Sequence, residues 1–343
     1  MKRSILLIYT GGTIGMKQDS ETLALVPFKF DQILQEVPEL KKFGYRIDSV
    51  SFDPPVDSSE ADPVFWTKLA NIIQDSYSDY DGFVVLHGTD TMSYSASALS
   101  FMLENLTKPV IFTGSQLPIG ILRTDGKENL ISSIEIAAAT DSEGRAMVPE
   151  VCIYFENRLY RGNRTIKYSA ENFSAFRSSN YPPLAEAGVH MKYNTSAVRT
   201  SGSGKEFRIH TNLDTGVAIL KIFPGITPLV VKSVLGMKEI KAVILETYGS
   251  GNAPTAEWFI DIIDETVKRD VIVVNVTQCQ TGKVDMEAYS TGILLKKTGV
   301  ISGHDITTEA ALAKLFFLLG QGYDNQTVKR LFEVDLRGEI TND

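Results

Sequence analysis

The feature that most constrains the fold is a repeated pairing of a short apolar run with a longer stretch of helical periodicity. In the first half, the apolar runs that end in small or polar residues are 5–9, 83–86 and 110–112. The stretches with apolar residues three and four positions apart are 63–76, 93–105 and 128–140. Such runs predict buried strands of a mostly parallel sheet, and their alternation with helices indicates an α/β fold.

The second half repeats this pattern after a polar, glycine-rich stretch at 195–215, whose composition is typical of a linker. Apolar runs follow at 217–223, 243–245 and 271–276, and helical periodicity at 255–269 and 308–319. A length of 343 residues also favours two domains over one. We therefore predict a larger N-terminal α/β domain with a mostly parallel sheet (1–195), a linker (196–214) and a smaller α/β C-terminal domain (215–343).

Charge and rare residues exclude several classes of protein. Lys and Arg number 34 against 42 Asp and Glu, a net charge of −8, so the chain lacks the basic excess that favours nucleic acids or anionic membranes. Two cysteines and four scattered histidines cannot build a disulfide scaffold or a HExxH zinc site. We expect no metal, no cofactor, no nucleic acid and no membrane partner. The apolar run at 5–9 is too short for a signal peptide, so a cytoplasmic location is expected.

Three common catalytic motifs are absent from the sequence. The Gly-Lys pairs lack the upstream glycine of a phosphate-binding P-loop, which excludes ATP binding by that motif. There is no GxSxG nucleophile elbow, and no GxGxxG fingerprint follows the first predicted strand. The common serine-hydrolase and dehydrogenase interpretations therefore lose their support.

Three hydroxyl-rich segments follow predicted strands, where ligands bind in open α/β sheets. In the segment 10–15, two glycines let the backbone turn sharply and present the hydroxyl of Thr13. The segment 87–91 supplies a second hydroxyl, Thr89, beside the carboxylate of Asp90. The third segment consists of Asp57, Ser58 and Ser59.

Each of these segments also has a purely structural interpretation. The glycine pair before Thr13 is compatible with a plain tight turn. Asp90 would equally cap the predicted helix at 93, and Asp57 would cap the one at 63. His87 is better explained as a packed histidine than as a base, because nothing adjacent in the sequence orients it.

The order of six segments is far more specific than any one of them. They are TGGTIG (10–15), DSS (57–59), HGTDTM (87–92), TGSQLP (113–118), RGNRTIK (161–167) and YGSGNAP (248–254). In this order they resemble the bacterial L-asparaginases over essentially the whole chain. The RLYRGNR wording and the expected absence of a signal peptide are similar to the type I, cytoplasmic branch.

The resemblance implies hydrolysis of the side-chain amide of L-asparagine to L-aspartate and ammonia, a reaction of amino-acid catabolism. It makes Thr13 the nucleophile that forms an acyl-enzyme, and Thr89, Asp90 and Lys167 the groups that handle protons. On residue type alone, Lys167 would be a surface lysine on a polar loop. A threonine hydroxyl is a weak nucleophile, so it needs a base or a polarised relay. N–H groups around Gly12 and Thr89 are suited to stabilise the oxyanion.

The same resemblance implies how the substrate is held. Hydroxyl donors would bind the α-carboxylate, and carboxylates, Asp90 included, would bind the α-ammonium group. The substrate-binding residues implied are Gly12, Asp57, Ser58, Ser59, Gly88 and Asn252. Asn252 would reach the site of a neighbouring subunit, so a homo-oligomer, either a dimer or a tetramer, is expected.

Two positions depart from the family's pattern. The loop after the nucleophile usually carries a tyrosine that contacts the nucleophilic threonine, whereas Leu25 stands at the best-aligned position of 22–27. The activation of Thr13 is therefore left open. Some type I enzymes bind a second asparagine through an arginine on the strand before the GNAP segment. Glu246 stands there in this chain, so we expect no effector site of that type.

Two other functions stay open. An ammonia-producing subunit of a tRNA-dependent amidotransferase resembles asparaginases in these motifs but normally carries an extra N-terminal domain, whereas the first predicted strand here starts at residue 4. The second alternative function is a non-catalytic amino-acid sensor on the same fold. The joint presence of Thr13, Thr89, Asp90 and Lys167 counts against a sensor, which needs no such set.

Overall fold

The structure, a computed structural model, describes residues 2–18, 25–27, 37–200 and 204–341. The chain divides into two compact units, residues 1–211 and 212–343. Most of the stretch predicted as a linker belongs to the first unit. Within it, β14 (Arg208–Ile209) pairs antiparallel with β6 (Leu103–Glu104).

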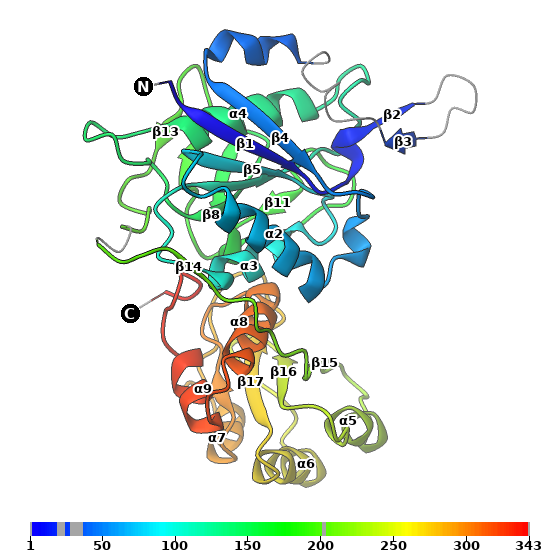
Figure 1. The fold of residues 1–343 in the computed structure, drawn as a ribbon. Helices are drawn as coiled ribbons and strands as arrows, with labels where there is room; N and C mark the ends of the chain where they lie inside the picture. The colour runs from blue at the N-terminus through cyan, green and yellow to red at the C-terminus, as the bar shows by residue number, and fades with distance from the viewer. Residues whose placement is uncertain (1, 19–24, 28–36, 201–203, 342–343) are drawn as a thin grey trace. The chain divides into compact units, whose positions relative to one another are not determined.

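An eight-stranded sheet forms the centre of the first unit, in the order β13-β12-β9-β8-β7-β5-β1-β4 (Figure 1). Its parallel strands are β1 (Ser4–Tyr9), β4 (Arg46–Ser51), β5 (Gly82–Leu86), β7 (Val110–Thr113) and β8 (Val151–Phe155). Antiparallel strands extend one edge: β9 (Arg158–Arg161), β12 (Ala185–Glu186) and β13 (Lys192–Tyr193). The prediction of a mostly parallel sheet in an α/β domain is confirmed.

Helices cover both faces of this sheet (Figure 1). They are α2 (Pro63–Asp75) and α3 (Met92–Met102) on one face and α4 (Gly126–Ala138) on the other. All were predicted, but α3 ends before residue 105 because Leu103 and Glu104 pair as β6. The shorter elements are η1 (Thr13–Gly15), β2 (Met16–Gln18), β3 (Leu25–Pro27), η3 (Pro38–Phe43), η4 (Ser58–Glu60), η5 (Gly162–Arg164), β10 (Ile166–Lys167) and β11 (Phe176–Arg177).

The strand order creates a switch point beside β1. The chain passes from β1 to β4 on one side and then returns to β5 on the other side of β1. Connections that leave neighbouring parallel strands in opposite directions open a crevice at their carboxyl ends. The segments 10–15 and 87–91 follow β1 and β5, so they lie at this switch point.

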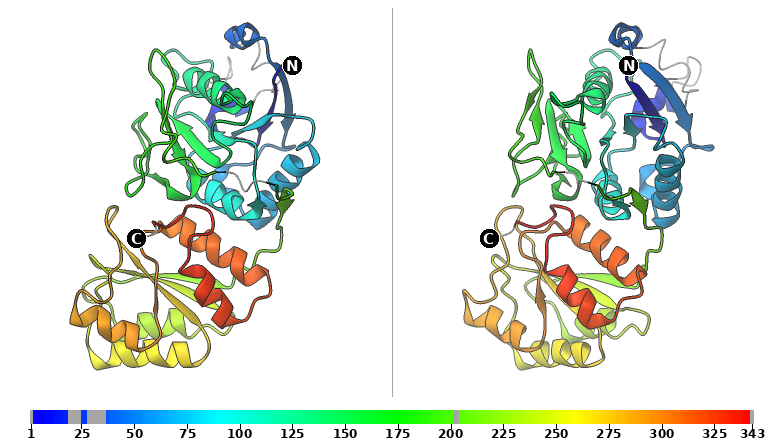
Figure 2. Two further views of the ribbon diagram at one scale, coloured as in Figure 1. Left: turned by 90° about the vertical axis from the view of Figure 1, so that its left-hand side faces the viewer. Right: turned by 60° about the vertical axis from the view of Figure 1, so that its left-hand side comes forward.

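The second unit is a smaller α/β layer structure (Figure 2). Its parallel strands, in sheet order, are β15 (Val217–Lys221), β16 (Ala242–Thr247), β17 (Ile272–Thr277) and β18 (Ile301–Ser302). One face carries α5 (Pro228–Leu235), α6 (Glu257–Lys268) and α7 (Ser290–Lys297), and the other carries α8 (Thr308–Gly320) and α9 (Asn325–Phe332).

The predicted helices α6 and α8 are confirmed, as are the predicted strands β15, β16 and β17. Periodicity did not reveal α5, α7 and α9. Each of them has only 8 residues, which is less than the window over which a helical repeat becomes evident.

Candidate active site

The three hydroxyl-rich segments of the first unit meet through two glycines. A Cβ added to Gly12 would lie 2.5 Å from the backbone N of Gly88, and a Cβ on Gly88 would lie 2.5 Å from Oγ of Ser58. Gly12 also has a φ of 91°, a conformation that favours glycine. Thr13 and Thr89 directly follow these touching glycines, so their backbones lie close together.

A short 3-10 turn shapes the segment 57–59. The Asp57 carboxylate accepts hydrogen bonds from the backbone N and the Oγ of Ser59, both at 2.9 Å. These bonds hold the pKa of the Asp57 carboxyl below its usual value. The alternative that Asp57 caps the helix at 63 is wrong, because Asp62 caps α2 by accepting from the backbone N of Phe65 at 2.8 Å.

The segment 57–59 is also tied to the segment 87–91. The hydroxyl of Thr91 donates to the backbone O of Ser58 at 2.5 Å. Ser58 is 5% exposed, whereas Asp57 and Ser59 are exposed. Thr91 was not among the residues singled out in the sequence, although it is the last hydroxyl of the HGTDT segment.

Lys167 joins the two groups with which the resemblance associates it. Its Nζ donates to Oγ1 of Thr89 at 2.9 Å and to Oδ1 of Asp90 at 2.5 Å. The Lys167 side chain is 19% exposed, so it is neither free nor on an open loop. Asp90 does not cap α3: the residue at the helix start is Thr91, and it makes no side-chain cap there.

Local packing explains how Lys167 reaches Thr89 from 78 positions away. Gly162 begins η5 so close to α3 that a Cβ there would lie 2.9 Å from the Cβ of Ala96. Just before it, Arg161 makes a buried ion pair with Glu150, with 2.6 Å between Nε and Oε2. The RGNR sequence therefore forms a turn that packs against α3, and this turn places Lys167 at the end of β10.

Thr13 begins η1, which Tyr9 supports from β1. The Tyr9 hydroxyl donates to the backbone O of Gly15 at 3.3 Å, and its ring leaves no room for a side chain at Gly15. Burial raises the pKa of Tyr9 to about 12, so the phenol keeps its proton. Among the described residues the hydroxyl of Thr13 makes no hydrogen bond.

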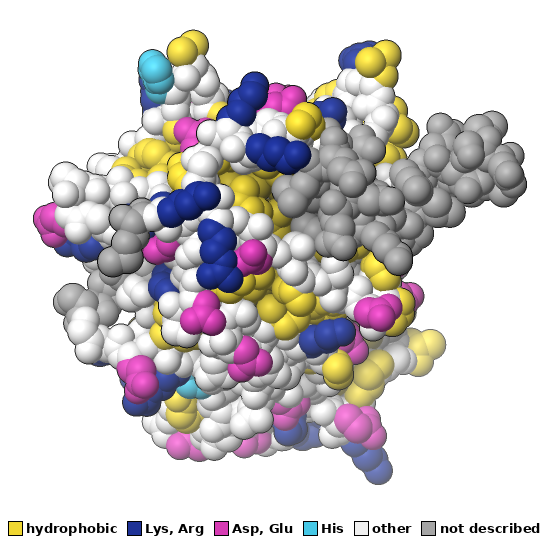
Figure 3. Space-filling model, turned by 45° about the horizontal axis from the view of Figure 1, so that its top comes forward, with side chains coloured by type: hydrophobic (Ala, Val, Ile, Leu, Met, Phe, Trp, Pro, Cys, Tyr) yellow, Lys and Arg dark blue, Asp and Glu magenta, His cyan; other side chains and the backbone are white. Residues whose placement is uncertain are grey.

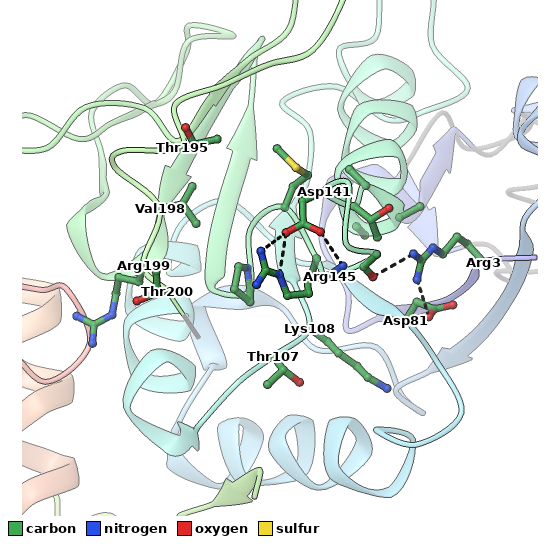
Figure 4. A pocket seen from close by; sticks show the side chains of 18 residues that line it. Arg3, Asp81, Thr107, Lys108, Asp141, Arg145, Thr195, Val198, Arg199 and Thr200 are labelled. Carbon is green, nitrogen blue, oxygen red and sulfur yellow. Dashed lines mark hydrogen bonds and ion pairs between the residues drawn. The ribbon is translucent and has the colours of Figure 1, made fainter. Parts of the chain in front are cut away.

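A separate cavity lies at the opposite edge of this sheet (Figure 4). It has a volume of about 790 Å³, and Arg3, Asp81 and Lys108 line it shortly before their strands begin. Its charges are largely paired, with 3.0 Å between Arg3 Nη1 and Asp81 Oδ1 and 2.8 Å between Arg145 Nη2 and Asp141 Oδ2. We do not place the reaction there, because the converging hydroxyl groups lie at the carboxyl edge.

Neither a membrane span nor a metal centre occurs within the described ranges. No described helix is long and apolar enough to cross a membrane. The described residues contain no group of at least 3 His, Cys, Asp or Glu side chains that could hold a metal ion. On the face that Figure 3 shows, Lys and Arg side chains lie among Asp and Glu side chains rather than in one basic field.

Comparison with known proteins decides the family. Residues 4–199 match the family described as Asparaginase, N-terminal, and residues 216–332 match the Glutaminase/Asparaginase C-terminal domain. The chain belongs to the asparaginase family. It is 44% identical to L-asparaginase 1 of Escherichia coli strain K12, over 100% of this chain and 99% of that protein.

Two further relatives match almost the whole of this chain. The crystal structure of L-asparaginase I from Vibrio cholerae is 42% identical, with a TM-score of 0.90 and coverage of 100% of both chains. A glutamyl-tRNA(Gln) amidotransferase subunit of Thermococcus kodakarensis is 33% identical, over 98% of this chain and 76% of that protein. The predicted resemblance to the asparaginases, type I branch included, is confirmed.

The second unit of this asparaginase carries the remaining residues of interest. Oδ1 of Asn252 accepts from Oγ1 of Thr291 at 2.5 Å, and this bond holds the turn after β16. Oε1 of Glu246 accepts from Oγ1 of Thr308 at 2.6 Å, and its Oε2 lies 3.7 Å from Nζ of Lys221.

Leu25, which stands where a tyrosine was expected from the resemblance, is only partly described. The backbone of Leu25 belongs to β3, which pairs antiparallel with β2 beyond η1. Its side chain and residues 22–24 lie outside what the structure describes.

Proposed function

We propose that this asparaginase hydrolyses L-asparagine to L-aspartate and ammonia through an acyl-enzyme on Thr13. The observation that carries the proposal is the contact of Lys167 with Thr89 and Asp90, next to the touching backbones of Gly12 and Gly88. A hydroxyl nucleophile, a second polarised hydroxyl and backbone N–H groups then face one crevice. No metal or cofactor takes part in the proposed reaction.

In the acylation step, Oγ1 of Thr13 attacks the amide carbon of the substrate side chain, and its proton passes to the relay of Thr89, Lys167 and Asp90. The electrons of the C=O bond move to oxygen, and the N–H groups of Gly12 and Thr89 stabilise that oxyanion. Thr89, Asp90 and Lys167 pass a proton to the amide nitrogen. The C–N bond breaks, ammonia leaves, and an ester on Thr13 is left.

In the deacylation step, water attacks the ester carbon and transfers a proton through the same relay. The C–O bond to Thr13 breaks, the hydroxyl regains its proton, and aspartate leaves. Lys167 donates to Oγ1 of Thr89, so this hydroxyl is polarised and its own proton is free to point at the reacting atoms.

The substrate's α-groups would be held at the rim of the crevice by Ser58, Ser59 and Asp57, together with Gly88 and Asp90. We also propose a cytoplasmic enzyme that forms a dimer or tetramer, in which Asn252 reaches a neighbouring subunit's site. Size-exclusion chromatography with light scattering tests the assembly, and cell fractionation tests the location.

The two alternative functions predict different outcomes in one experiment. A coupled ammonia-release assay with asparagine and with glutamine, in the absence of tRNA and of any partner subunit, tests all of them. A free asparaginase releases ammonia from asparagine without any partner, an amidotransferase subunit needs its partner, and a sensor releases no ammonia.

Asparagine should be preferred to glutamine by on the order of 10²-fold in kcat/KM. Ser58 is buried and Asp90 is ion-paired with Lys167. In the proposed site they would hold the α-groups at a set distance from Thr13. The extra methylene of glutamine then displaces its amide by about an ångström, which is enough to spoil the attack geometry. Initial rates with both amides measure this ratio. Equal efficiencies would contradict the fixed geometry.

Initial rate should rise hyperbolically with asparagine concentration, without activation by a second asparagine at Glu246. The Glu246 carboxylate is held by Thr308 and Lys221, and it would repel an effector carboxylate by about 1 kcal/mol for unit charges 4 Å apart in water. A ligand that binds two conformations with equal affinity does not shift the equilibrium between them. A sigmoidal curve that Glu246→Ala converts to a hyperbolic one would overturn this expectation.

A further inference from the structure

A buried chain of hydrogen bonds ends at the backbone O of Gly88, the residue before Thr89. Nε1 of Trp66 donates to Oγ of Ser95 at 2.9 Å, and Oγ of Ser95 lies 2.9 Å from Nε2 of His87. Nδ1 of His87 lies 2.6 Å from the backbone O of Gly88. Trp66, Ser95 and His87 are 5%, 0% and 1% exposed. The chain therefore links α2 and α3 to the segment that follows β5.

The direction of every bond in this chain follows from which atoms can donate. A carbonyl oxygen only accepts, so Nδ1 of His87 must carry the proton. Burial lowers the pKa of His87 to about 4, so the ring is neutral near pH 7 and its Nε2 can only accept. Ser95 must then donate to Nε2, and Trp66, which is a donor only, completes the chain.

Aromatic packing holds the imidazole in this orientation. The ring of Phe65 meets the His87 ring edge-on, with 5.3 Å between centroids and an interplanar angle of 88°. Phe112 also packs against this ring, with 5.8 Å between centroids. The prediction that His87 is a packed histidine is confirmed, but both of its ring nitrogens are engaged in one polar chain.

We infer that Trp66, Ser95 and His87 are positioning residues that orient and polarise the Gly88–Thr89 peptide, whose N–H is the proposed donor to the oxyanion. When the carbonyl of a peptide accepts a hydrogen bond, its N–H becomes a stronger donor, and bonds in a chain reinforce one another. The carbonyl of Gly88 is held toward the buried ring of His87, and in a trans peptide the N–H of Thr89 points the opposite way. The inference rests on the proposed site, because it assigns the Thr89 N–H to the oxyanion.

The first test compares two serines of α3. Ser95→Ala removes the donor to His87, whereas Ser97→Ala removes an equally buried hydroxyl that has no hydrogen-bond partner among the described residues. We expect Ser95→Ala to lower kcat about tenfold with KM changed less than about twofold, because loss of a complete oxyanion donor costs roughly 10²- to 10³-fold. Ser97→Ala should keep the wild-type kcat. Equal kcat values for the two variants would overturn the inference.

Three further variants guard against loss of folding. Trp66→Phe removes only the indole N–H and keeps an aromatic ring, and it should lower kcat in the same way as Ser95→Ala. His87→Asn places an amide near the position of Nδ1 and should retain several-fold more kcat than His87→Leu, which cannot donate to Gly88. A purely structural role predicts that activity tracks thermal stability in all four variants, and that result would also overturn the inference.

A spectroscopic readout separates this inference from the proposed site. In protein labelled with ¹⁵N-threonine, the amide proton of Thr89 should move upfield in Ser95→Ala and stay in place in Ser97→Ala, because a weaker chain polarises the peptide less. An unmoved signal in both variants contradicts the relay. Activity retained by Thr13→Ala would instead refute the proposed site, whatever the serine variants do.

Discussion

Thr13→Ala is expected to lower the rate of ammonia release from asparagine by at least about 10⁴-fold, because it removes the atom that forms the acyl-enzyme. The loop around Thr13 is shaped by Gly12, Gly15 and Tyr9 rather than by the threonine hydroxyl. Thermal unfolding should therefore stay close to that of the wild type, since a surface-loop substitution usually changes stability by less than about 0.5 kcal/mol.

Thr13→Ser is the matched control, because it keeps a hydroxyl on the same backbone. It should retain much more activity than Thr13→Ala in the same coupled assay. Mass spectrometry after rapid acid quench should find an aspartyl adduct on the wild type and none on Thr13→Ala. Ammonia release at the wild-type rate from Thr13→Ala would refute the nucleophile assignment.

Lys167→Met should lower kcat by about 10²- to 10⁴-fold while KM changes little. The Lys167 ammonium polarises Thr89 and binds Asp90, a proton-handling arrangement that acts in the transition state more than in substrate binding. Thr89→Val keeps the side-chain shape, removes the hydroxyl, and should show the same pattern. Steady-state kinetics with asparagine measure both parameters.

Lys192→Met is the control for loss of a lysine, because Lys192 is exposed on the edge strand β13 and has no place in the proposed reaction. It should leave kcat and KM unchanged. If Lys167→Met and Thr89→Val instead raise KM at constant kcat, both residues serve binding only. That outcome would refute their role in proton transfer.

The fold was largely predictable because its signals are local. A buried parallel strand is apolar along its length, and a covering helix repeats every three to four residues, so neighbours along the chain suffice to recognise β1, β5, α2 or α6. The edge strands β12 and β13 have only 2 residues each and leave no such signal. Their pairing depends on β9, which itself depends on the hairpin from β8.

The candidate site was predictable in part, for a related reason. Thr13 and Thr89 follow strands whose ends are evident in the sequence, and parallel strands bring such ends to one edge. Lys167 has no such marker, and only the resemblance to the asparaginases drew attention to it. Only the structure could decide between the alternative roles of Asp57 and Asp90, because a carboxylate beside a helix start can cap the helix or pair with another group.

The sequence by itself therefore determined the α/β architecture, the glycine-hydroxyl segments at the strand ends and the family. Only the tertiary structure decided that Lys167 donates to Thr89 and that Thr91 donates to the backbone O of Ser58. It also decided that His87 belongs to a chain of hydrogen bonds rather than acting as a base. The physical reason is that these contacts depend on sheet order and helix packing, which set the distances between residues far apart in the chain. Periodicity encodes which side of an element is buried, but not which distant side chain it will meet there.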